Sequence, residues 1–177
     1  MADRISIDLD AREVLAGLHR LLAATGPGGL APALKEIGED LVESTKRRFE
    51  TSTAPDGSRW APNAQATFAS YLARRDDAAK LTRKDGRLNK RGAAVAANKR
   101  PLVASGILQD TIAYRVEGDS LFVGTNRFAG EWDGGAAVHQ FGSRNGKIPA
   151  RPFLGISADD ERDIMDVIQR HIGRAMG

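Results

Sequence analysis

The 177-residue sequence contains no cysteine, and only 6% of its residues are aromatic. Without cysteine the chain has no disulfide framework, no thiolate nucleophile and no zinc site built on sulfur ligands. It also lacks any apolar run near the roughly 18 residues of a membrane span, so we expect no membrane partner. The apolar fraction of 41% and the charged fraction of 28% are those of a globular protein. A single domain over residues 1–177 is expected from this length.

The N-terminal region lacks the pattern of a secretory signal. Residues 1–13 interleave acidic and basic side chains and contain no apolar stretch, whereas a signal peptide needs one. Together with the absence of cysteine, this favours a cytoplasmic origin.

Motifs for cofactors and metals are missing too. The Gly-Pro-Gly-Gly run at residues 26–29 is not followed by Gly-Lys-Ser/Thr, and no GxGxxG occurs, so no nucleotide cofactor is expected. Residues 159–163 hold four carboxylates, but they directly follow Ser157. Acidic side chains in that position favour a helix N-terminus, so we predict a helix start here and no metal site.

None of the three histidines stands in a catalytic arrangement. His19 falls within an amphipathic helical pattern and His171 in the last turn of another, where surface or capping roles are usual. His139 has no serine, aspartate or glutamate beside it in a recognisable catalytic pattern. We predict a structural anchor at His139 and no enzymatic activity; an enzyme would need a buried His139 that faces a carboxylate in a pocket.

Hydrophobic periodicity predicts an α+β fold, in which long amphipathic helices pack an antiparallel β-sheet. Helical spacing is clearest over residues 30–51 and from Ser157 to the C-terminus. Alternation over residues 112–116 and 121–123, around Glu117-Gly118-Asp119-Ser120, predicts a β-hairpin. Weaker patterns predict a strand at 5–9 and helices at 10–26 and 66–75.

Positive charge is concentrated in one segment. Residues 74–100 contain ten Lys or Arg and three Asp, whereas the rest of the chain has 16 basic and 20 acidic residues. With few large apolar side chains, residues 74–101 are predicted to form a flexible basic limb. Such a limb suits polyphosphate or an acidic neighbouring subunit. The candidate cations for contact with DNA or an acidic partner are Arg83, Lys84, Arg87, Lys90, Arg91, Lys99 and Arg100.

Two loop motifs in the second half of the chain, residues 136–143 and 149–155, each contain a phenylalanine. We predict that Phe141 and Phe153 anchor these loops in the core, while the intervening "RNGK" tip carries Arg144 and Lys147 as candidate contacts with partner proteins or other subunits. Arg151 lies between two prolines, which keep the chain extended. We expect Arg151 to bond to a carboxylate or carbonyl, and we include a neighbouring subunit among its candidate partners.

Trp60 lies in a turn-rich segment, and two alternatives remain for its side chain. A large ring in such a place usually packs the loop onto the body. In the alternative, Trp60 is exposed and joins Arg151 and the tip as a subunit contact.

Four segments in succession carry a resemblance to a known family. "PDGSRWAPN" at 55–63, "LVASGILQDTIAYRVEGDSLFVGTN" at 102–126, "VHQFGS" at 138–143 and "IPARPFLGIS" at 148–157 resemble the phage virion morphogenesis family. Its members are tail completion proteins of Mu-like and related contractile-tailed phages. The resemblance covers residues 30–175, with departures at Phe128-Ala129, at Ser143 and in an inserted "GEWDGG" at 130–135.

The resemblance implies a non-enzymatic structural protein of the virion, which completes the tail or its junction with the head. It implies a ring of identical subunits, a hexamer, at the head-proximal end of the tail. Expected partners are tail tube or sheath proteins, head–tail connector proteins and DNA that passes through the lumen. The expected location is the virion tail or neck, after assembly in the host cytoplasm. A protein that binds nucleic acid without sequence specificity through residues 74–100 is the alternative.

Overall fold

The computed structural model describes residues 29–85, 87–126 and 135–176, together with positions 16, 19, 20, 23 and 26. The predicted strand at 5–9 lies outside the described residues. So does most of the predicted helix at 10–26, of which positions 16, 19, 20 and 23 are helical. Most of the inserted loop at 130–135 and the Phe128-Ala129 departure also lie outside them.

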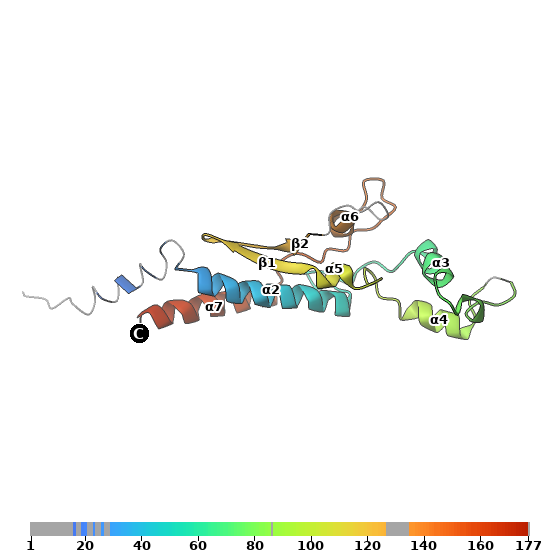
Figure 1. Ribbon diagram of the computed structural model, residues 1–177, viewed down its shortest axis with the longest axis horizontal. Coiled ribbons are helices and arrows are strands. Elements are labelled where there is room, and N and C mark those ends of the chain that lie inside the picture. Colours follow the sequence, from blue (N-terminus) through green and yellow to red (C-terminus); the bar gives the residue numbers. More distant parts are fainter. Residues whose placement is uncertain are drawn as a thin grey trace, which may run out of the picture.

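Two long helices run side by side in opposite directions, α2 (Ala31–Thr51) and α7 (Ala158–Met176) (Figure 1). Their contact buries Ala33 and Ile37 of α2 against Val167 of α7. Near the C-terminal end of α7, His171 Nε2 lies 2.8 Å from a carboxylate oxygen of Glu36, so polar contacts close the interface there. α2 ends at Ser52, whose left-handed φ of 56° lets its N–H bond to the carbonyl of Arg48.

A β-hairpin lies along α2 on the side away from α7 (Figure 1). Its strands, β1 (Ile112–Glu117) and β2 (Ser120–Thr125), are antiparallel with Tyr114 opposite Val123. They form the only sheet in the described part of the chain. The approach to α2 is close, because a Cβ on Gly38 would come within 2.5 Å of the Tyr114 ring. The predicted α+β fold is therefore confirmed, with the layers α7, α2 and hairpin.

Three aromatic rings form the core at the other end of α2. Phe49 packs edge-on against Trp60, with ring centroids 5.4 Å apart and planes at 82°, and it packs against Phe153 at the same centroid distance. Ile112 of β1 completes this cluster. Each ring buries a large apolar area, so the cluster joins α2, the hairpin and two loops into one body.

The basic segment at 74–101 lies in a longer stretch, residues 64–101, that extends beyond the end of α2 (green, right of Figure 1) and is called the limb from here on. It contains α3 (Gln65–Ala73), the short 3-10 helix η1 (Ala78–Lys80) and α4 (Lys90–Ala97). Leu81 is fully buried, and the Asn89 side chain caps α4 by accepting from the N–H of Gly92 at 2.9 Å. Composition predicted a flexible segment here. Within residues 74–101 the structure contains two short helices, η1 and α4, and the flexibility of the segment stays a prediction.

Gly92→Ala tests how tightly the limb is packed. Helix propensity alone predicts that alanine stabilises α4 by about 1 kcal/mol. However, a Cβ at position 92 would overlap the carbonyl oxygen of Leu81, so we expect faster trypsin cleavage within the limb and unchanged thermal unfolding of the body. Ala94→Ser, at an exposed position of the same helix, is the matched control. Slower cleavage of Gly92→Ala would show that the contact yields easily.

The remaining elements are two short helices, α5 (Ile107–Asp110) before the hairpin and α6 (Gly135–Phe141) after it. Among the described residues, no helix combines the length and apolar character needed to cross a membrane.

Candidate functional site

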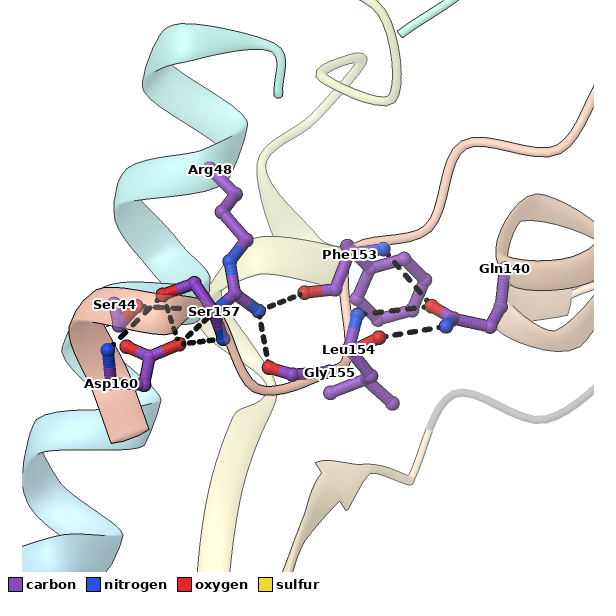
Figure 2. Close-up of polar contacts among 8 residues, drawn as sticks. All are labelled: Ser44, Arg48, Gln140, Phe153, Leu154, Gly155, Ser157 and Asp160. Atoms are coloured by element: carbon purple, nitrogen blue, oxygen red, sulfur yellow. Dashed lines mark hydrogen bonds and ion pairs between the residues drawn. The ribbon is translucent and has the colours of Figure 1, made fainter. Parts of the chain in front are cut away.

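Residues 148–157, named here the anchor segment, are held by side chains from several elements (Figure 2). Arg48 of α2 donates from Nη1 to the carbonyls of Phe153 at 3.0 Å and Gly155 at 2.7 Å. Its other terminal nitrogen forms an ion pair with Asp160 of α7. Arg48 and Asp160 are both about 95% buried, with 5% of each exposed. One guanidinium group thus ties both long helices to the anchor segment.

Asp160 also begins α7. Its carboxylate accepts from the N–H and the hydroxyl of Ser157, both at 2.7 Å, while the Ser157 hydroxyl accepts from the N–H of Asp160 at 3.2 Å. This reciprocal cap is the helix start that the sequence predicted at Ser157. Burial alone would raise the pKa of Asp160, but hydrogen bonds from Ser44 and Ser157 and the charge of Arg48 together lower it below its ordinary value.

We expect this cap to make the protein sensitive to acid. Because the folded pKa of Asp160 lies below the unfolded value of about 3.9, its contribution to stability is full above that value and is lost as the pH falls below it. Asp160→Asn should therefore lose stability at pH 7 and show a flatter decline between about pH 4 and pH 2. Urea unfolding at several pH values measures this; parallel curves for the two proteins would contradict it.

Gln140 of α6 binds the anchor segment from the side opposite Arg48 (Figure 2). Its Oε1 accepts from the N–H groups of Phe153 and Leu154, each at 3.0 Å, and its Nε2 donates to the Leu154 carbonyl at 2.8 Å. The amide satisfies three backbone groups that no strand pairs. Sequence reasoning concentrated on His139 and missed Gln140, although both belong to the same "HQFG" motif.

Arg151 and Trp60 are buried within their own chain, so Trp60 follows the alternative in which its ring packs the loop onto the body. Each is 6% exposed. Arg151 donates from Nε to the Ala61 carbonyl and from Nη2 to the Pro62 carbonyl, both at 2.8 Å, and Trp60 Nε1 donates to the Pro152 carbonyl at 2.8 Å. Arg151 does bond to carbonyls, but they belong to its own chain. Burial lowers the pKa of its guanidinium group.

The two phenylalanines of the loop motifs differ in burial. Phe153 is fully buried in the aromatic cluster, whereas Phe141 is 79% exposed, so the predicted anchoring role of Phe141 is wrong. The side chains of adjacent helix residues point about 100° apart. In α6 the side chain of Gln140 faces the anchor segment, so that of Phe141 points elsewhere. His139 is half-buried, and its carbonyl accepts from the N–H of Arg151 at 2.7 Å.

The tip between these loops presents its cations to solvent. Arg144 and Lys147 are exposed. The turn beneath them is held by Asn145, whose side chain accepts from the Lys147 N–H at 3.1 Å, and by Ser143, whose hydroxyl accepts from the Ile148 N–H at 2.8 Å. We name Phe141, Arg144 and Lys147 the tip surface.

Most of the predicted contact cations of the limb are exposed, but Lys99 is not available. The Nζ of Lys99 donates to the Val103 carbonyl and lies 5.1 Å from the centre of the Tyr71 ring. Burial lowers the pKa of Lys99. Arg91 forms a 3.6 Å ion pair with Asp77 of the same limb. The exposed cations of the candidate set are Arg83, Lys84, Arg87, Lys90, Arg91 and Arg100.

No metal-binding cluster of His, Cys, Asp or Glu occurs among the residues that the structure describes. The backbone carbonyl of His139 accepts a hydrogen bond from the N–H of Arg151 in the anchor segment. The buried polar groups hold loops to helices, so the arrangement is that of a rigid framework beneath two exposed surfaces, the tip surface and the limb.

The sequence of this chain matches the model of a known protein family. The model of the phage virion morphogenesis family matches residues 9–94 and 82–173. The chain belongs to that family. The resemblance seen in the motifs is thereby confirmed, and the two matched segments overlap within the limb.

Two relatives from this group cover almost the whole chain. The chain is 28% identical over 171 residues to the Mu-like prophage FluMu G protein 2 of Haemophilus influenzae, an alignment that covers 93% of this chain and 94% of the relative. It is 27% identical over 165 residues to tail completion protein S of Escherichia phage P2, covering 89% and 93% respectively. No solved structure matches the chain significantly.

Proposed function

We propose that this member of the virion morphogenesis family is a structural protein that completes the phage tail. The observation that carries this function is the match along residues 9–173, joined to a relative named tail completion protein that aligns over 89% of the chain. In the proposed role, the chain forms a ring, a hexamer, at the head-proximal end of the tail. It is assembled in the host cytoplasm and remains in the tail or neck of the virion.

The tip surface supports a role in binding virion proteins. Phe141 is 79% exposed and stands close in sequence to the exposed Arg144, and both phenylalanine and arginine are enriched at protein interfaces. The hydrogen-bonded turn beneath it holds Arg144 and Lys147 in place before binding, which lowers the entropy lost on association. We assign this surface to the tail tube or sheath proteins and to the head–tail connector.

Ring formation would follow from a heterologous contact, in which one surface of a subunit binds a different surface of the next. When the rotation between neighbours closes, every such surface is covered and growth stops. A closed ring thus ends the tail and offers one face for docking of the head.

The test is removal of the chain from its phage. We expect tails without the protein to be abnormal or unattached to heads in electron micrographs, with normal particles restored by the wild-type gene. A Phe141→Ser, Arg144→Glu and Lys147→Glu variant should fail to restore them, while Arg115→Glu, at an exposed position of the hairpin, should succeed. Normal attachment without any copy of the chain would refute the proposed function. Native mass spectrometry of the released ring measures its stoichiometry.

Binding of nucleic acid is the second candidate, because the limb exposes six cations. The Tyr71 ring of the limb already lies against two cations, with its centre 5.8 Å from the Arg75 guanidinium carbon and 5.1 Å from Lys99 Nζ. Stacking on bases is therefore not favoured. Monomers that bind DNA with micromolar affinity and a steep loss with salt would support this candidate; binding only to tails would support completion.

A further inference from the structure

An open groove of about 1080 Å³ runs between α2, α7 and the turn at residues 53–57. It lies on the body, whereas the limb extends away from the body beyond α2 (Figure 1). Its floor includes Arg48 and Asp160, which are fixed by the anchor segment. The walls are therefore rigid surfaces of two long helices.

The groove carries an excess of negative charge. Seven carboxylates line it, against three guanidinium groups. These three are already paired: Arg48 with Asp160, Arg47 with Glu43, and Arg170 with Glu36.

Four of the groove's carboxylates, Asp40, Asp56, Asp163 and Asp166, form no ion pair in the described part of the chain. Burial and the charges of Glu36, Asp163 and Glu43 raise the pKa of Asp40, although Arg170 opposes them. Like charges held close to one another disfavour the ionised form of each group. A cationic partner in the groove would relieve this repulsion.

The limb offers the opposite charge on a preformed support. A 2.7 Å bond from the Arg83 N–H to the Arg87 carbonyl brings these two residues together, and Arg83, Lys84 and Arg87, named here the basic turn, are all exposed to solvent. Thr82 pairs with Leu88 at the base of this turn. The cations are thus presented together by a short hairpin-like projection.

We propose that the basic turn of one copy's limb docks in the acidic groove between α2 and α7 of a neighbouring copy. The two surfaces are complementary in charge, and the limb of the same chain extends away from α2 and α7 (Figure 1), the helices that line the groove. A contact between two different surfaces of identical subunits is heterologous, the kind that generates rings. The inference rests on the proposed ring and gives it a subunit contact.

Cross-linking in a chain without native cysteine tests the contact directly. We would combine Lys84→Cys in one tagged copy with Asp163→Cys in another and oxidise the mixture. The expected product is the mixed dimer, both in protein at about 0.1 mM and in assembled tails, while a chain with both substitutions gives a ladder that ends at the ring. Lys84→Cys with Arg115→Cys, which lies on the exposed face of the hairpin, is the control pair.

Charge exchange provides the second measurement. Arg83→Glu, Lys84→Glu and Arg87→Glu together should weaken self-association about 10-fold or more, as should Asp40→Lys, Asp163→Lys and Asp166→Lys. A mixture of the two variants should recover association, since one complementary pair of surfaces is restored. All six positions are exposed, so circular dichroism should show unchanged folding.

Cross-linking no greater than that of the control pair, in both concentrated protein and tails, would overturn the proposal. So would a charge-exchanged mixture that recovers nothing, or a limb variant that loses DNA binding while self-association is unchanged. If tails are completed without the chain but the mixed dimer forms, the proposed function fails and the contact stands. If tails need the chain but no mixed dimer forms, the contact alone fails.

Discussion

Replacing Arg48 by alanine is expected to lower the free energy of unfolding by about 3 to 5 kcal/mol. The substitution leaves the carboxylate of Asp160 buried without its cation and removes the donor to the carbonyls of Phe153 and Gly155. The carboxylate of Asp160 then keeps its bonds from Ser157 but lacks its cation, and the buried carbonyl of Phe153 loses its donor; both losses are costly away from water. Urea unfolding followed by circular dichroism measures the loss.

Arg47→Ala is the matched control, one residue earlier in α2. Arg47 pairs with Glu43 on the surface, where their side chains are 67% and 74% exposed. Such a pair contributes about 0.5 kcal/mol or less. Similar losses for the two variants would mean that Arg48 is not the joint between the long helices and the anchor segment.

Phe153→Ala is expected to cost about 3 to 5 kcal/mol as well, through a cavity in the core. The Phe153 ring is fully buried and packs on Phe49. Its loss also frees the anchor segment beside Trp60, so we expect the tryptophan fluorescence of the native state to shift towards the red. Thermal unfolding and emission spectra measure both effects.

Phe141→Ala tests whether the stability lost on removing a phenylalanine ring depends on how deeply the ring is buried. The two phenylalanines come from similar loop motifs, but Phe141 is 79% exposed, so its removal should change stability by about 0.5 kcal/mol or less. The same substitution should reduce attachment to tails if the tip surface binds virion proteins. A large loss of stability in Phe141→Ala would show that this ring packs against the body.

The long helices and the hairpin could be predicted because their signals are local. The apolar positions Leu34, Ile37, Leu41 and Phe49 fix the face of α2, and strict alternation fixes the inner face of the hairpin. The cap of α7 could also be read, since Ser157 and Asp160 are three residues apart. Each of these features needs only neighbours within one or two turns of chain.

The hydrogen bonds and the ion pair that hold the anchor segment could not be predicted, because the residues that form them are far apart in the sequence. Arg48 meets residues 153–160, and Arg151 meets Ala61 and Pro62. Nothing in the local sequence distinguishes buried Arg48 from exposed Arg47, or buried Phe153 from exposed Phe141. In the limb, composition reports a lack of apolar area but does not reveal local contacts such as the cap that Asn89 provides for α4.

The base of the limb has a mechanical consequence. Asn63 bonds to the Lys99 carbonyl at 2.9 Å and so closes the base, and the adjoining residues Trp60 to Pro62 bond directly to Arg151 and Pro152. A force that a neighbouring subunit exerts on the limb would therefore act through residues 60–62 on the anchor segment, which leads into α7. Tension that arises between subunits would load the part-buried hydrogen bonds of Trp60 and Arg151.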